Sequence, residues 1–251
     1  MQTRILSVLL FAVVLGVSVF AQETQGVITA KSVYRVIQVD GDVKDWDGIP
    51  PACIDPTGDG GAHYDFAAAY VANDKNNLYF RITFAETTSY GEYFWYINTA
   101  FDTDLDSNTG HKWSIVFGSE FNIQGTKVFD QRSGSWVSLE GESNEENDWG
   151  AFAYVPVSPT DSAILSKDVE FAVPRNLVYK NLDNGKPGLS NPDGSPLFDP
   201  TTNTFKMVFE TEDENYSSVE WMPDPDPDTR EAGIIYTFAQ APAPVNAWEL
   251  Y

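Results

Sequence analysis

The sequence predicts an all-β protein, a single-domain antiparallel β-sandwich of the immunoglobulin-like or jelly-roll-like kind. Two observations lead to this prediction. Short apolar or alternating segments recur along the chain with Gly, Pro, Asn and Asp between them, whereas helical periodicity is nearly absent. Many short strands separated by turn signals are typical of a β-sandwich. The roughly 230 residues that follow the N-terminal segment are enough for one such domain with a sizeable core.

The predicted strands are short and spread over the whole chain. They cover Val33–Val39, Phe66–Ala72, Leu78–Phe84, Phe94–Phe101, Trp113–Phe117, Lys127–Phe129, Trp136–Leu139, Ala151–Val155, Val169–Val173, Phe205–Glu210, Ser218–Met222 and Ile234–Phe238. The clearest hairpin is AYVANDKNNLYFRITF, in which two apolar strands flank a turn at Asn73–Asn77. Asn and Asp tolerate the backbone conformations that such turns require.

The N-terminal residues 1–21 are typical of a secretory signal peptide. Arg4 precedes an apolar run that extends to Phe20, and Val19 and Ala21 suit a cleavage site after Ala21. The run is short for a membrane span and lacks a charged stop-transfer flank, so we expect no membrane insertion after cleavage. An uncleaved anchor is the alternative. We therefore expect a secreted protein or one at the periplasm or cell surface.

Charge and cysteine content narrow the classes of partner. The formal charge is −22, which disfavours nucleic acid and anionic membranes as partners but attracts divalent cations. Cys53 is the single cysteine, so the chain has no internal disulfide and must rely on packing or on metals. Aromatic residues make up 14% of the chain, with 7 Trp, which suits a β-protein that uses rings as contact surfaces.

Several segments read as loops or as a tail. Residues 181–202 and the stretch PDPDPDTR at 223–230 have loop composition, and 241–251 forms a Pro/Ala-rich tail ending in NAWELY. The predicted domain therefore covers 22–240. The two aromatics of the tail allow docking on a protein partner; a frayed terminus is the other interpretation.

Three blocks in this order resemble the family 9 carbohydrate-binding modules of the DOMON-like superfamily. They are VIQVDGDVKDWDGIPP (36–51), AAAYVANDKNNLYFRITF (67–84) and WYINTAFDTDLDSNTG (95–110), and later blocks follow in the family's order to about residue 240. The resemblance implies a β-sandwich whose sugar-binding members clamp a glycan end between two tryptophans and carry structural calcium. Related branches bind haem b, and fold alone does not transfer function.

The stretch FDTDLDSNTG is the candidate metal site. Alternating acids on a tight loop can converge on one Ca²⁺, which takes six to eight oxygen ligands. It is not an EF-hand, because Ser107 stands where that loop needs Gly and Trp113 where it needs Glu. A solvated turn is the alternative. The predicted ligands of a structural calcium are Asp102, Asp104, Asp106 and Asn108.

Sugar recognition needs flat apolar rings with a few polar groups at their edges. The candidate ligand-binding residues are Tyr90, Tyr93, Trp136, Trp149 and Trp221. In the family, one clamp tryptophan falls just before the central strand, where this chain has the two tyrosines. The other falls after VEWMPDP, where this chain continues without an aromatic, so the clamp is at best half present. Each candidate ring could instead belong to the core.

Two other chemistries have weaker support. Haem binding would need axial ligands such as Met207 or Met222 with His63 or His111, and no spacing selects a pair. The sequence contains neither the G-x-S-x-G elbow nor a zinc-binding motif of hydrolases, so we expect that the protein is not an enzyme. The prediction is an exported, non-catalytic carbohydrate-binding protein with structural calcium. The alternatives are a surface or extracellular assembly subunit and, third, a haem b electron-transfer domain.

Overall fold

The structure is a computed structural model that describes residues 25–60, 65–89, 97–112, 117–124, 127–130, 135–137, 151–156, 165–175, 203–213, 215 and 217–243. The predicted signal peptide and the C-terminal tail from residue 244 lie outside these ranges. Within them the regular elements are β-strands and one 3-10 turn, and no helix is long and apolar enough to cross a membrane.

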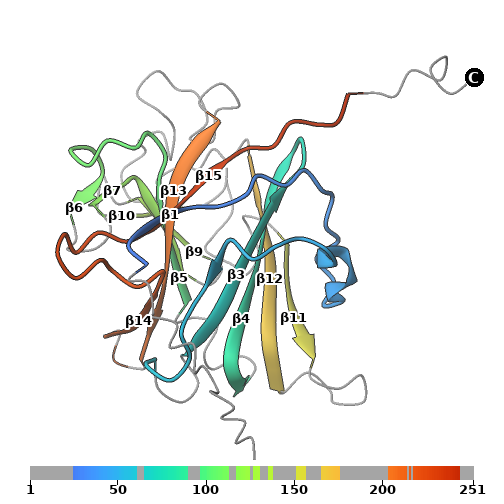
Figure 1. The fold of residues 1–251 in the computed structure, drawn as a ribbon, viewed down its shortest axis with the longest axis horizontal. Helices are drawn as coiled ribbons and strands as arrows, with labels where there is room; N and C mark the ends of the chain where they lie inside the picture. Colours follow the sequence, from blue (N-terminus) through green and yellow to red (C-terminus); the bar gives the residue numbers. More distant parts are fainter. Residues whose placement is uncertain are drawn as a thin grey trace, which may run out of the picture.

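The described strands form an antiparallel β-sandwich, as predicted (Figure 1). The larger sheet has the order β1 (Val27–Thr29), β15 (Gly233–Thr237), β13 (Thr204–Glu212), β5 (Ile97–Asp102), β8 (Phe121–Gln124), β9 (Lys127–Asp130) and β10 (Ser135–Val137), and β14 (Ser218–Met222) also pairs with β13. The smaller sheet has the order β11 (Ala151–Pro156), β12 (Leu165–Pro174), β4 (Asn77–Ser89), β3 (Phe66–Asn73) and β2 (Cys53–Ile54). A short ribbon joins β6 (His111–Lys112) to β7 (Phe117–Ser119), and only β1 and β15 pair in parallel among these strands.

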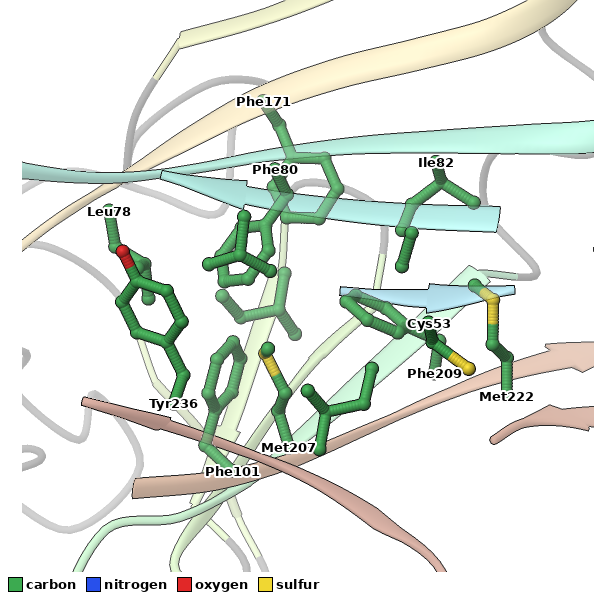
Figure 2. Close-up of a cluster of buried hydrophobic side chains, with 14 of the residues drawn as sticks. Cys53, Leu78, Phe80, Ile82, Phe101, Phe171, Met207, Phe209, Met222 and Tyr236 are labelled. Carbon is green, nitrogen blue, oxygen red and sulfur yellow. The ribbon is translucent and has the colours of Figure 1, made fainter. Parts of the chain in front are cut away.

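The hydrophobic core lies between the two sheets and is rich in phenylalanine (Figure 2). Phe80 from the smaller sheet lies at its centre. Its ring centroid is 4.9 Å from that of Phe171, 5.9 Å from that of Phe101 and 5.8 Å from that of Phe209. Because side chains alternate across a strand, one face of each sheet supplies these rings and the other faces outward.

The predicted hairpin at residues 69–84 is confirmed as part of β3 and β4. Asp74 closes its turn, because its Oδ1 accepts hydrogen bonds from the backbone N–H groups of Asn76 and Asn77, each at 2.6 Å. This aspartate turn is a local interaction that a sequence pattern can predict.

The predicted strand at Val33–Val39 is wrong. Only Tyr34 makes a β-bridge, to Asn73, and the segment runs on into a 3-10 turn, η1 (Val43–Trp46). Inside the segment the backbone N–H of Gln38 bonds to Asp45 Oδ2 at 2.8 Å, and just after it the chain meets Glu170 on β12, a fully buried carboxylate on the outer face of the smaller sheet. Its oxygens accept hydrogen bonds from the backbone N–H groups of Asp40 (2.9 Å) and Gly41 (2.7 Å), so these donors are turned away from any neighbouring strand.

Glu170 also accepts a hydrogen bond from Trp46 Nε1 at 2.9 Å. The Trp46 ring is 2% exposed. It packs in a second, smaller hydrophobic cluster with Ile37, Ile49 and Tyr79 on the outer face of the smaller sheet. Glu170 therefore attaches the N-terminal segment to that face.

Candidate functional site

The acidic loop that follows β5 begins with a buried aspartate. Asp102 is 1% exposed, and its Oδ1 accepts a hydrogen bond from the backbone N–H of Leu105 at 2.7 Å. Lys206 Nζ lies 2.9 Å from Asp102 Oδ2. Burial raises the pKa of Asp102, and the lysine opposes that rise. The loop is thus attached to the sheet at its first carboxylate.

Three carboxylates converge at this loop, and one of them was not predicted. Asp102, Asp104 and Glu120 each place an oxygen within 4.8 Å of the other two. Asp102 and Glu120 are buried, whereas Asp104 is exposed at the rim. Calcium binds oxygens at 2.3–2.6 Å, so ligand oxygens on one ion lie up to about 5 Å apart. The group is therefore of a size that one hard cation can fill.

Glu120 is held in place by the loop itself. Its Oε2 accepts a hydrogen bond from the backbone N–H of Thr103 at 2.7 Å, and its Oε1 accepts one from Thr109 Oγ1 at 2.9 Å. Burial raises its pKa to about 7. Because burial of a negative charge without a counter-charge is unfavourable, a cation next to Glu120 would restore its ionised form.

The two remaining predicted ligands are not brought into this group. Asp106 Oδ1 accepts hydrogen bonds from the backbone N–H and the side-chain amide of Asn108, at 3.0 and 2.8 Å. These bonds lower the pKa of the exposed Asp106 carboxyl. Asp106 and Asn108 form a local turn at the loop tip. For this second half of FDTDLDSNTG the structure therefore has the solvated turn that the sequence analysis gave as the alternative to a metal site.

Gly118 allows the loop to lie against β7. Its φ is +84°, and a Cβ there would lie 2.8 Å from the Asp106 carbonyl oxygen and 3.1 Å from Asp102 Oδ2. Any side chain would therefore push the loop away from the carboxylates. In the sequence, an acidic residue directly before the apolar strand that pairs with β5 is the signal that could have found Glu120.

A second feature is the outer face of the larger sheet around Trp221. Ala100, Val208 and Ala232 form a small buried apolar cluster there, and the partly exposed Trp221 ring packs against it. Asn98 and Asn122 lie on the same face, by strand alternation, and Asn122 Nδ2 donates a hydrogen bond to Asn98 Oδ1 at 3.1 Å. The face thus carries Trp221 on β14 and, two and three strands away in the sheet, the buried amide side chains of Asn98 and Asn122.

Glu210 is the register partner of Trp221 and shares its face. It is 4% exposed, and Ser218 Oγ donates a hydrogen bond to its Oε1. Burial raises the pKa of Glu210 to about 7, above its ordinary 4.5. Because the folded protein binds this proton more tightly than the unfolded chain, the stabilising contribution is complete below about pH 4.5 and is lost as the pH rises through 7.

Glu210→Gln should therefore change the pH dependence of stability. We expect equal free energies of unfolding for variant and wild type near pH 4, and a variant that is more stable by about 1–3 kcal/mol at pH 8. Urea unfolding of both proteins between pH 4 and 8 measures the difference. Other buried carboxylates titrate in both proteins, so their contributions cancel in the difference between the two free energies of unfolding. A stability difference that stays constant over this range would contradict the role of Glu210.

The other four predicted ligand-binding residues are Tyr90, Tyr93, Trp136 and Trp149. Tyr90, Tyr93 and Trp149 lie outside the described residues, and Trp136 lies in β10, where Phe129 of β9 is its register partner. Met207 and Met222, considered as haem ligands, are fully buried in the core, where Figure 2 shows them among phenylalanine rings. Trp221 is thus the predicted ring that the structure locates on a face.

Comparison with known proteins gives distant similarities only. No protein-family model matches the chain, and no curated protein matches it. Among solved structures, a family 9 carbohydrate-binding module from Caldicellulosiruptor kristjanssonii in complex with cellotriose shares 11% identity over 86% of this chain and 100% of that one, with a TM-score of 0.38. A module of the same family and organism in complex with glucose shares 10% identity over 87% and 99%, with a TM-score of 0.39. Both similarities are too distant to place this chain in a family.

Proposed function

We propose that this protein is an exported, non-catalytic carbohydrate-binding protein whose acidic loop holds a structural calcium ion. The observation that carries the binding proposal is the partly exposed Trp221 ring, which packs on a buried apolar cluster on the outer face of the larger sheet. Sugar rings stack their C–H faces on aromatic side chains, while their hydroxyls bond to amides and carboxylates. Export is supported by the signal-peptide pattern of residues 1–21.

Calcium is supported by the geometry of Asp102, Asp104 and Glu120. Three carboxylates carry more negative charge than Lys206 alone can offset, and two of them are buried. Oxygen ligands at this spacing suit Ca²⁺, whose coordination geometry is flexible. The ion would fix the acidic loop against β7 and β8. It would stabilise the fold, and the ligand would bind elsewhere.

Asp104→Asn should remove most of the stabilisation that calcium confers through this loop. At a calcium concentration 100-fold above the dissociation constant, that stabilisation is about 2.7 kcal/mol. Asp106→Asn is the matched control, because Asp106 bonds to Asn108 and stands outside the converging group. Thermal unfolding with calcium and with chelator measures both. Equal calcium responses of the two variants would contradict the assignment of Asp104 as a ligand.

Glycan binding tests the function itself. The mature chain, shown to be folded by circular dichroism, is applied to a glycan array in the presence of calcium and again with chelator. We expect selective binding to a subset of neutral glycans, and a loss of binding with chelator only where removal of calcium unfolds the chain. A folded protein that binds no glycan under either condition would overturn the carbohydrate assignment.

A further inference from the structure

A second group of carboxylates lies where the two sheets meet, far from the acidic loop in sequence. Asp55 directly follows β2, Asp65 directly precedes β3, and Glu220 lies in the middle of β14. Figure 1 shows β14 and the start of β3 at the same end of the sandwich, and the two strands are in contact. Asp59 belongs to the loop between β2 and β3.

The three residues nearest the core are almost completely buried. Asp55 is 3% exposed, Glu220 is 5% exposed and Asp65 is 7% exposed. Glu220 points inward, because it lies two residues from Met222, which is fully buried in the core. A glutamate on the inner face of a sandwich sheet is costly unless its charge is compensated.

Several oxygens of this group have no partner among the described residues. Both carboxylate oxygens of Asp55 are buried without a hydrogen bond, as are Asp65 Oδ1 and Glu220 Oε1. The other oxygens are used by the backbone: Glu220 Oε2 accepts from the N–H of Phe66 at 2.6 Å, and Asp65 Oδ2 accepts from that of Gly58 at 2.7 Å. The backbone thus fixes the Glu220 and Asp65 carboxylates through one oxygen each, whereas both oxygens of Asp55 have no partner.

No positive side chain offsets these charges in the part of the chain that the structure describes. The ion pairs found there join Lys44 to Asp42, Arg81 to Asp168 and Lys206 to Asp102. Something other than a lysine or arginine must therefore balance the group, and a bound cation or a shared proton are the two candidates.

The geometry favours a cation. Asp55, Asp59 and Glu220 each offer an oxygen within 4.8 Å of the other two, which is the spacing of ligands around one calcium ion. Asp59 is exposed, so the group is open to solvent on one side and buried on the other. Buried Gly60 keeps the loop close, because a Cβ at that position would clash with the Glu220 carboxylate and lie 2.7 Å from Asp65 Cα.

We propose that Asp55, Asp59 and Glu220 bind a second divalent cation of the calcium class, and that this ion links the β2–β3 loop of the smaller sheet to β14 of the larger one. Asp65 acts as a positioning residue through its bond to Gly58. A chain with a single cysteine has no disulfide to join its sheets, and a cation at this point would supply such a link.

Calcium titration of the chelator-treated full chain by isothermal calorimetry tests the proposal. Wild type should bind one more ion than Asp55→Asn/Glu220→Gln, a variant that keeps side-chain size and removes the buried charges. The control Asp104→Asn/Glu120→Gln should retain this binding event, so the result does not depend on the first site. The proposal is overturned if the Asp55/Glu220 variant binds as many ions as wild type.

Asp59→Asn covers the case in which the double variant fails to fold, because an exposed loop residue tolerates substitution. It should weaken the second binding event about tenfold or more, and unchanged calcium affinities would overturn the proposal. If Asp55 and Glu220 instead share a proton, the only calcium binding of the wild type will be the event that Asp104→Asn/Glu120→Gln removes. That result also overturns the proposal. Glycan binding is a separate readout, so failure of the carbohydrate proposal would leave this result unaffected.

Discussion

Replacement of Glu170 by alanine is expected to lower the free energy of unfolding by about 3–5 kcal/mol. The carboxylate is fully buried and accepts three hydrogen bonds, from the backbone N–H groups of Asp40 and Gly41 and from Trp46 Nε1. Without it, three donors lose their partner beneath the N-terminal segment. Urea unfolding at pH 7 measures the loss.

Two further substitutions test that the effect comes from these bonds. Glu170→Gln keeps the size of the side chain but directs an N–H₂ group toward donors, so we expect an intermediate loss of about 2 kcal/mol. Lys167→Ala, on an exposed position of the same strand, should change stability by less than about 0.5 kcal/mol. An alanine variant of Glu170 as stable as the Lys167 variant would show that the carboxylate does not hold the segment.

Phe80→Ala is expected to have an effect of similar size, about 3–5 kcal/mol, for a different reason. The Phe80 side chain is fully buried and packs against Phe101, Phe171 and Phe209, which come from both sheets. Its removal leaves a cavity at the sheet-to-sheet contact that rigid rings on β-strands cannot easily fill. Denaturant unfolding monitored by far-ultraviolet circular dichroism measures the change.

Phe80→Leu is the matched control, because leucine retains most of the apolar volume. We expect a loss of about 1–1.5 kcal/mol, well below that of the alanine variant. If both substitutions cost the same small amount, Phe80 would not lie in a closely packed core. That result would contradict the sandwich arrangement described above.

The sequence predicted the fold where the signals are local. The hairpin around Asn73–Asn77 depends on alternating apolar residues and on Asp74, whose bonds reach only to Asn76 and Asn77. Strand β14, predicted with its exact ends, also lies between Ser217 and Pro223, residue types that favour turns. Such patterns arise from local backbone conformation and from the burial of apolar side chains away from water. They can therefore be predicted without knowing which distant residues come into contact.

The prediction for Val33–Val39 failed because side chains, not a strand, take up its amides and those that follow: Gln38 N–H bonds to Asp45 Oδ2. The apolar residues of the segment do reach a hydrophobic surface, since Ile37 is buried. However, the amides of Asp40 and Gly41 bond to Glu170, which is 130 and 129 residues away. No local pattern could reveal that a glutamate in a later strand would end the extended segment.

The candidate sites show the same limit. The alternating acids of FDTDLDSNTG predicted a metal site, and Asp102 and Asp104 do lie together with Glu120, yet spacing alone could not separate Asp104 from Asp106. The difference arises because β8 pairs beside β5 and brings Glu120 to the loop. The Asp55–Glu220 group was even less predictable, because it needs strands from both sheets to meet. In a chain with 37 acidic residues, acidic neighbours in sequence carry little information.

Isothermal titration of the folded chain with a neutral oligosaccharide selected on the array, for wild type and Trp221→Ala, tests the proposed function most directly. Loss of the ring should weaken binding by about tenfold or more, because stacking on an aromatic face contributes on the order of 1–3 kcal/mol. Tyr70→Ala is the control, since Tyr70 is a partly buried ring on the smaller sheet. The proposal predicts loss of binding for Trp221→Ala alone; equal affinity of Trp221→Ala and wild type would contradict it.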